Sequence, residues 1–175
     1  MRWNLLKDLN QHAAYSITNH LGTIYMFTAN KNAPVFAEGE VEIKASPEVI
    51  WKIMTDINKW PDWNPDVKQA SMEGEIAEGM AFQWKAGPGK IISTVRSVEE
   101  GHLIAWTGRT LGIIHAIHVW KLEPRNGNTI VRTEESWEGI VTRIFRGKME
   151  KMLEKAIQSG LHSLKNEAEK RKNLK

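Results

Sequence analysis

A junction between a strand and a helix near residue 46 is the feature that most restricts the fold of this chain. The preceding segment, residues 35–45, alternates apolar and charged residues as a half-buried strand does. Ser46 then stands at a helix N-cap position, and Pro47 occupies the first helical position, where its missing N–H costs nothing. The sequence therefore predicts one strand followed directly by a short helix.

Two tryptophans follow this helix in a proline-rich turn, Trp60-Pro61-Asp62-Trp63-Asn64-Pro65. Because proline disfavours helical backbone in the residue before it, Trp60 and Asn64 are predicted to be extended. A stiff turn of this kind holds both indoles in place. We expect Trp60 and Trp63 to close one end of a sheet, with ligand contact as a secondary role.

The central part of the chain reads as a series of short strands divided by turn residues. The turn signals are Gly87-Pro88-Gly89, Glu100-Gly101 and Asn126-Gly127-Asn128. Strands are predicted at residues 66–73, 80–86, 90–99, 102–110, 114–123 and 129–137. Consecutive strands without helices between them indicate an antiparallel sheet.

The last segment, residues 144–172, repeats apolar residues at helical spacing. The predicted stripe consists of Phe145, Met149, Met152, Leu153, Ala156, Ile157, Leu161, Leu164 and Ala168. A helix of this length measures roughly 40 Å, so it must lie across most of a small sheet. Gly160 in the stripe either lets the sheet approach closely or leaves space for something between them.

The motifs Ala45-Ser46-Pro47-Glu48-x-Ile50-Trp51 and Trp60-Pro61-x-Trp63-x-Pro65 resemble those of the START-like superfamily, also called SRPBCC. Within it, the chain is similar to the polyketide cyclase/dehydrase and lipid-transport group, over about residues 36–170. The resemblance implies an α+β helix-grip fold, in which a curved antiparallel sheet of about seven strands wraps around a long C-terminal helix. Two short helices follow the first strand. It also implies an apolar cavity between sheet and helix.

The resemblance divides the chain into an N-terminal extension, residues 1–35, and a START-like domain, residues 36–175. The extension is expected to be partly helical or flexible. Its least charged part, residues 13–29, is interrupted by too many polar residues for a membrane span. The first part of the extension is consistent with an amphipathic helix, packed on the domain or lying on a membrane, with an apolar side made of Trp3, Leu5, Leu6, Leu9 and Ala13.

Basic charge is concentrated at the C-terminal end of the chain. Residues 143–175 hold ten Lys/Arg and four Asp/Glu, a balance of +6, whereas the whole chain is +3. The plain interpretation is the solvated face of an amphipathic helix, and the next is peripheral contact with anionic lipid. No nucleic-acid motif accompanies the charge. The chain has no cysteine, so a reducing cytoplasm is the expected location, while the oligomeric state is left open.

The period of two within each strand predicts which side chains face the interior. In the strand at 114–123 the set containing His118 and Trp120 is the more apolar, and in the strand at 129–137 we favour the set containing Glu135 and Trp137. The predicted ligand-binding residues are Trp60, Trp63, Phe82, Trp84, Trp106, His118, Trp120, Glu135, Trp137, Met149, Met152, Leu153 and Ile157.

His118 and Glu135 are the candidate catalytic residues. A histidine among apolar neighbours acts as an acid or base when a carboxylate orients it, and Glu135 is that partner if both side chains point inward. The alternative is a buried histidine held by a backbone or hydroxyl group. His115 and His118 lie on opposite faces of their strand, so no metal pair is expected, and no cofactor is expected either.

Two functions follow from these expectations. The first is binding or transport of a hydrophobic small molecule, such as a lipid, an isoprenoid or a polyketide-like compound, in the implied cavity. The second is an enzyme resembling the polyketide cyclases, in which His118 and Glu135 move protons with Arg109 or Thr107 near the mouth. A fold by itself confers no chemistry, so we favour binding over catalysis.

Overall fold

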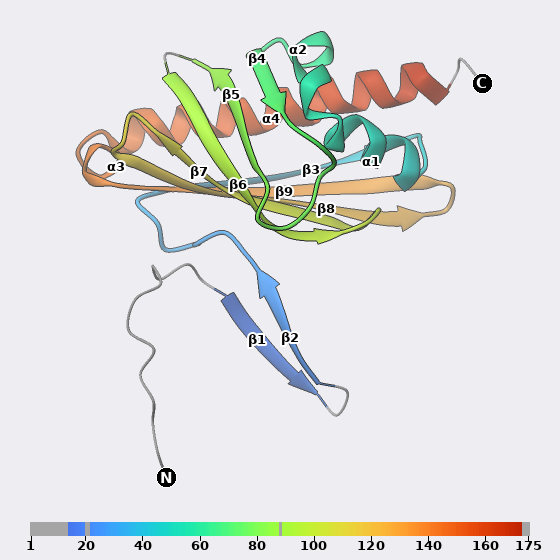
Figure 1. The fold of residues 1–175 in the computed structure, drawn as a ribbon, viewed down its shortest axis with the longest axis horizontal. Helices are drawn as coiled ribbons and strands as arrows, with labels where there is room; N and C mark the ends of the chain where they lie inside the picture. The colour runs from blue at the N-terminus through green and yellow to red at the C-terminus, as the bar shows by residue number, and fades with distance from the viewer. Residues whose placement is uncertain (1–13, 20–21, 88, 173–175) are drawn as a thin grey trace.

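A long C-terminal helix lies across one face of an antiparallel sheet (Figure 1). This computed structural model describes residues 14–19, 22–87 and 89–172. The strands are β1 (Ala14–Asn19), β2 (Gly22–Phe27), β3 (Val35–Ile43), β4 (Val67–Met72), β5 (Ala81–Ala86), β6 (Gly89–Glu99), β7 (Leu103–Thr110), β8 (Ile114–Arg125) and β9 (Asn128–Glu138). The helices are α1 (Pro47–Thr55), a 3₁₀ turn (Ile57–Lys59), α2 (Trp60–Trp63), α3 (Ile140–Ile144) and α4 (Arg146–Lys172).

Strands β3 to β9 form one seven-stranded sheet in the order β3-β9-β8-β7-β6-β5-β4. Every neighbouring pair is antiparallel, and the first strand of this sheet pairs with the last, Val35 opposite Trp137. With α4 against it, this is the α+β helix-grip fold that the resemblance implied. The predicted strands agree with the observed ones to within a few residues.

The alternation within the strands divides the sheet into two apolar faces. The inner face, which α4 covers, carries Ile104, Trp106, Trp120 and Val131 in the main core, as the period of two predicted. The outer face carries a smaller cluster made of Ala29, Leu103, Ala105, Ile117 and Val119, with Phe27 and Phe36 packed against it. Both faces of the middle strands are therefore buried, the outer one beneath residues that precede β3.

Helix α4 buries one stripe, made of Met149, Leu153, Ile157, Gly160, Leu161, Leu164 and Ala168. Spacings of three and four residues keep this stripe on one face. Three residues that the sequence assigned to the stripe are instead exposed: Phe145 at 56%, Met152 at 48%, and Ala156. The helix was expected to start at Ile144, but the chain breaks at Phe145, and Met152 lies beside the buried row rather than within it.

One glycine sets the distance between α4 and the edge strand β3. A Cβ atom added at Gly39 would come within 3.0 Å of side-chain atoms of Leu161 and Ile157. Only a residue without a side chain lets the helix approach this closely. The sequence predicted either such an approach or free space at Gly160, where an added Cβ would have only an ordinary contact, 3.9 Å from the indole of Trp120.

The turn after α1 differs from the prediction at its first tryptophan. Trp60 has φ −54° and ψ −40°, so it is helical rather than extended, and the N–H of Asn64 donates to its carbonyl at 2.9 Å. Pro61 occupies the first turn of α2, where a missing N–H breaks no helical hydrogen bond. Asn64, with φ −107° and ψ 104°, is extended as predicted. Ser46 is the N-cap residue of α1, although its hydroxyl forms no capping hydrogen bond.

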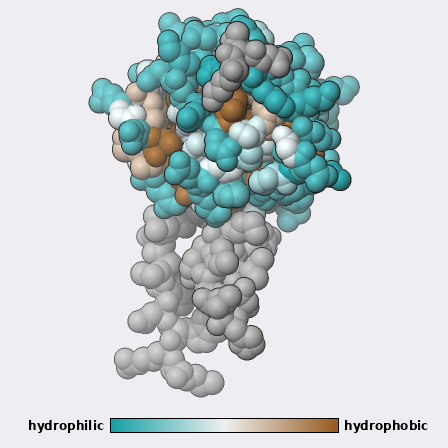
Figure 2. Space-filling view, turned by 90° about the vertical axis from the view of Figure 1, so that its right-hand side faces the viewer, coloured by the Kyte–Doolittle hydropathy of each residue, from teal (hydrophilic) through white to brown (hydrophobic). Residues whose placement is uncertain are grey.

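The extension contributes a hairpin that was not predicted. Strands β1 and β2 pair only with each other, Ala14 opposite Phe27. The expected helix over Trp3 to Ala13 lies outside the described residues. Figure 2 shows the end of the molecule with α1 and the C-terminal part of α4, whose surface is mainly hydrophilic.

Candidate functional site

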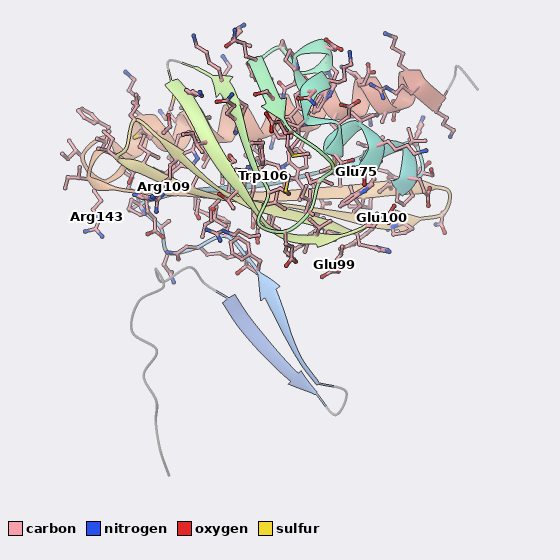
Figure 3. The ribbon with its side chains drawn as sticks, in the orientation of Figure 1. Glu75, Glu99, Glu100, Trp106, Arg109 and Arg143 are labelled. Atoms are coloured by element: carbon pink, nitrogen blue, oxygen red, sulfur yellow. The ribbon has the colours of Figure 1, made fainter. Side chains whose placement is uncertain are left out.

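Aromatic rings fill the centre of the inner face. The ring of Trp60 lies 5.6 Å from those of Phe82 and Trp84, and 5.7 Å from that of Trp106. Trp106 continues the contact to His118 at 4.8 Å, and Figure 3 places it in the middle of the fold, between sheet and α4. The offset and edge-on arrangements are those that aromatic rings prefer. Side chains from α2, β5, β7 and β8 therefore form one cluster.

His118 and Glu135 lie side by side at the edge of this cluster. They are opposite each other on β8 and β9, and His118 Nδ1 is 3.3 Å from Glu135 Oε2. Each residue is only 8% exposed. Glu135 Oε1 also accepts a hydrogen bond of 2.7 Å from the indole N–H of Trp137. The structure thus brings together the two candidate acid-base residues, in the buried interior.

Thr133 determines which nitrogen of His118 carries the proton. Its hydroxyl donates to the carbonyl of Val119 at 3.0 Å, and its oxygen lies 2.9 Å from His118 Nε2. Because the single hydroxyl proton is already used, Nε2 must be the donor in that contact. In the neutral ring Nδ1 is then an acceptor that faces Glu135.

Burial determines the protonation states of His118 and Glu135. It raises the pKa of Glu135 to about 7, an effect that the Trp137 N–H partly opposes, and it lowers the pKa of His118 to about 3. Both shifts disfavour the charged form, as expected when no water is available to solvate it. At mildly acidic pH the histidine is therefore neutral and the carboxyl group protonated, with the acidic proton available to Nδ1.

The two pKa shifts predict opposite pH dependences of stability. The folded state keeps the Glu135 proton up to about pH 7, whereas the unfolded chain loses it near the ordinary pKa of 4.5. The contribution of Glu135 to the free energy of unfolding therefore decreases as pH rises between those values. His118 is neutral in the folded state down to about pH 3 but titrates near 6.5 when unfolded, so its contribution increases over that range. The two effects cancel between about pH 4.5 and 6.5.

Single substitutions should expose the separate slopes. Between pH 4.5 and 6.5, Glu135→Gln should give a free energy of unfolding that rises with pH relative to wild type, by about 1.4 kcal/mol per unit. His118→Gln should give the opposite slope. Urea denaturation at several pH values measures both. Parallel profiles for the wild type and the two variants would contradict the assigned protonation states.

Two further buried nitrogens have no hydrogen-bond partner among the described residues. They are the indole Nε1 atoms of Trp120 and Trp63, and His118 Nδ1 likewise lacks a partner of good geometry. By contrast, Trp60 donates to the carbonyl of Met54 and Trp84 donates to the hydroxyl of Ser93. A buried donor without a partner costs free energy, which a ligand oxygen would recover.

The other predicted ligand-binding residues fall into three groups. Those buried in or packed on the main core are Trp60, Phe82, Trp84, Trp106, Trp120, Trp137, Met149, Leu153 and Ile157. Trp63 is half-buried at the edge of the core, and Met152 is exposed. Thr107 and Arg109, expected near the mouth, follow inward-facing Trp106 and Gly108, so they lie on the outer face.

Sequence reasoning missed two buried residues that carry hydroxyl groups, Thr133 and Ser93. Thr133 belongs to the same inward-facing set of β9 as Glu135, and Ser93 is fully buried on β6, but neither is among the predicted site residues. The alternation of Ile91, Ser93 and Val95 on β6 was the available signal. A serine on an otherwise apolar inward row must find a partner, and the indole of Trp84 is that partner.

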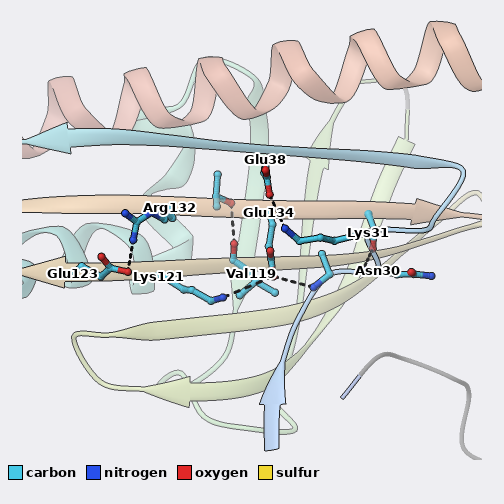
Figure 4. Close-up of polar contacts among 11 residues, drawn as sticks. Asn30, Lys31, Glu38, Val119, Lys121, Glu123, Arg132 and Glu134 are labelled. Carbon is cyan, nitrogen blue, oxygen red and sulfur yellow. Dashed lines mark hydrogen bonds and ion pairs between the residues drawn. The ribbon is translucent and has the colours of Figure 1, made fainter. Parts of the chain in front are cut away.

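Two of the hollows formed by described residues lie away from the aromatic cluster, and none of its rings lines them. One, of about 310 Å³, lies on the outer face between Glu38, Lys121, Arg132 and Glu134. Figure 4 shows its charged rim, where Arg132 binds Glu123 and Glu134 accepts from the N–H of Ala29. The other, of about 480 Å³, runs between α2 and α4 and is lined in part by Trp63 and His162. The expected cavity between sheet and α4 is thus not shown.

The seven-stranded sheet, the helix across it and the buried polar pair define a helix-grip protein of the START-like class. A family model described as polyketide cyclase / dehydrase and lipid transport matches residues 35–169. The chain belongs to this family. No curated protein matches the sequence significantly.

Solved structures of low sequence identity share the fold. A hypothetical protein from Helicobacter pylori has a TM-score of 0.72 at 14% identity, covering 83% of this chain and 98% of its own. The Zhui aromatase/cyclase from Streptomyces sp. R1128 has a TM-score of 0.64 at 16% identity, covering 78% and 94%. A START superfamily protein from Mycobacterium smegmatis has a TM-score of 0.56 at 20% identity, covering 74% and 98%.

No group of three or more histidine, aspartate or glutamate side chains within the described ranges is arranged to hold a metal ion. In the same part of the chain, no helix is long and apolar enough to span a bilayer.

Proposed function

We propose that this protein binds a hydrophobic small molecule that carries oxygen acceptors, between the inner face of the sheet and α4. The observation that carries the proposal is the buried indole N–H of Trp120, a donor that has no hydrogen-bond partner among the described residues and lies within an aromatic lining. Apolar walls with a few convergent polar groups are the usual composition of a small-molecule site. The family assignment supports the same function.

The ligand must displace side chains, because rings occupy the space in the described structure. At the contact between α4 and Trp120, Gly160 has no side chain, and a Cβ added there would lie 3.9 Å from the indole without a clash. Methionine at position 149 adds an adaptable side chain to the same helix face. We place the protein in the cytoplasm, which agrees with a chain that has no cysteine.

Native mass spectrometry of gently purified protein tests this proposal. We expect a retained apolar compound, and saturable changes in tryptophan fluorescence with at least one of three probes, oleic acid, farnesol and 2-naphthol. Trp120→Phe removes one indole N–H and should weaken binding by about threefold to tenfold, the value of one hydrogen bond. Trp84→Phe is the matched control, because its N–H already has a partner in Ser93. Absence of both retention and saturable binding would contradict the proposal.

A second candidate function is acid-base catalysis on a polyketide-like substrate. The specific observation in its favour is the 3.3 Å separation of His118 Nδ1 and Glu135 Oε2, with one neutral base and one protonated acid. His118 would take a proton from the carbon next to a carbonyl. Glu135 would protonate a hydroxyl on the neighbouring carbon, so that water leaves and a carbon–carbon double bond forms.

The same binding samples separate carrier from catalyst. If the protein is only a carrier, the mass of a β-hydroxy ketone probe is unchanged after incubation with it. The enzyme produces a compound that has lost one water, and Glu135→Gln abolishes this change while keeping the binding. A probe that loses water equally with wild type and Glu135→Gln would exclude the catalytic role.

A further inference from the structure

Most of the exposed large apolar side chains gather at two neighbouring segments. Seven such residues are exposed among the described ones, and six of them lie in the β7–β8 turn or between α3 and the second turn of α4. Ile144 and Leu111 are the most exposed, each at 65%. We call these six residues the apolar tip: Leu111, Ile113, Ile140, Ile144, Phe145 and Met152.

The backbone brings the two segments of the apolar tip together. Gly139, which precedes α3, lies directly against the carbonyl of Ile113 in the β7–β8 turn. The N–H of Phe145 donates to the carbonyl of Val141 at 3.0 Å, which joins α3 to the start of α4. Figure 1 places α3 at one end of the long axis, opposite the C-terminus. The apolar tip is therefore one surface at one end of the molecule.

This surface is also the basic end of the fold. Residues 109–115 and 139–152 contain Arg109, Arg143, Arg146, Lys148 and Lys151 against the single acid Glu150, a balance of +4. None of these five cations forms an ion pair with another described residue. Figure 3 shows Arg109 and Arg143 at this end, and Glu75, Glu99 and Glu100 away from it.

The cations are not explained by the stability of α4. Its first turn contains no acidic residue, and it begins with Arg146 and Lys148. Positive charge at a helix N-terminus opposes the helix dipole and costs stability. The opposite end of the molecule, seen in Figure 2, is mainly hydrophilic with smaller apolar patches, and among the described residues the only large apolar side chain exposed outside the apolar tip is Ile92. Both features therefore indicate a contact surface rather than a folding requirement.

We propose that the apolar tip docks on the surface of an anionic lipid bilayer. Ile144, Phe145 and Leu111 enter the boundary between headgroups and acyl chains, while Arg143, Arg146 and the neighbouring cations face lipid phosphates. A second copy of the chain is a poor occupant, because two surfaces of +4 repel each other. The proposal concerns the outer surface and does not depend on what the interior binds.

The surface also lies next to the interior. Ile114, Trp137 and Val141 lie beneath the tip and pack on the main core, and Trp137 donates to Glu135. A molecule that leaves the bilayer at the tip would thus meet the buried polar pair after crossing one layer of side chains. Docking on a bilayer and binding in the interior are separate properties. The place of the apolar tip next to the core would give a bound molecule a short path between them.

Flotation of the full chain with lipid vesicles tests the docking. We expect binding to vesicles of 70% phosphatidylcholine and 30% phosphatidylglycerol, little binding to phosphatidylcholine alone, and loss of binding as salt is raised. The double variant Ile144→Ser with Phe145→Ser should reduce binding at least tenfold. Replacing Arg143, Arg146 and Lys148 by Gln should reduce it about fivefold per charge on the anionic vesicles only.

Three lysines far from the tip give a matched control. Lys44→Gln, Lys52→Gln and Lys170→Gln remove the same charge from exposed positions in or near β3, α1 and the end of α4, and should leave most of the binding intact. Circular dichroism confirms that each variant is folded. Binding that is absent, or that the tip variants and the control variant reduce equally, would overturn the proposal. So would a dimer in size-exclusion chromatography that the Ile144→Ser and Phe145→Ser variant dissociates.

Discussion

Replacing Trp106 by alanine should lower the free energy of unfolding by about 3–5 kcal/mol. The indole is 5% exposed and contacts the rings of Trp60, Phe82 and His118. Its removal takes one ring out of three ring pairs and leaves a cavity that rigid neighbours cannot fill. Urea denaturation measures the loss, and added indole should recover part of it by filling the space.

Trp63→Ala is the matched control for this substitution. The same number of atoms is removed, but Trp63 is only half-buried. Its indole is not part of the ring pairs formed among the described residues. We expect a loss well below that of Trp106→Ala, because less apolar surface returns to water. Equal losses for the two variants would contradict the central place of Trp106 in the core.

The second large effect is expected at Gly139, where Gly139→Ala should cost at least about 2 kcal/mol. Its φ of 138° is outside the range of residues with side chains, and an added Cβ would collide with the carbonyl of Ile113. The β7–β8 turn and the start of α3 cannot both keep their positions in this variant. Thermal unfolding measures the loss.

Two other glycines serve as controls that distinguish the cost of backbone strain at Gly139 from the cost of its steric clash with Ile113. Gly101 has a φ of 72° with open space around it, so Gly101→Ala should cost only the backbone strain, about 1 kcal/mol. Gly147 lies in the first turn of α4 with nothing near its would-be Cβ, so Gly147→Ala should leave stability unchanged or slightly higher. A cost at Gly139 no greater than that at Gly101 would mean that the contact with Ile113 relaxes freely.

Local patterns explain why the sheet and the inward faces could be predicted. The first strand of the large sheet alternates apolar and charged residues from Glu40 to Ile43, and Asn126-Gly127 separates the last two strands. Both turn residues have positive φ, 50° and 80°, as a two-residue hairpin turn requires. Because that turn pairs Arg125 with Asn128, counting back along both strands places His118 opposite Glu135. The sequence thus contained the register of the candidate pair.

The remaining differences come from tertiary packing, which local patterns do not report. The spacing of Phe145 and Met152 is compatible with the buried stripe of α4, but the chain breaks at Phe145 and Met152 lies beside the buried row, so both are exposed. The filling of the interior by rings depends on side-chain rotamers from four separate elements. The prediction that residues 1–35 are partly helical or flexible stays a prediction for the residues outside the described ranges.

The pairing of β3 with β9 restricts the order in which the chain can fold during synthesis. β3 has no strand partner until residues 128–138 have been made, although α1 and β4 to β8 are complete before then. A nascent or truncated chain that ends before β9 therefore presents two unpaired strand edges, those of β3 and β8, to other chains. Interruption of translation in this interval should yield aggregates, while a stop after residue 138 leaves every strand of the large sheet with its partner.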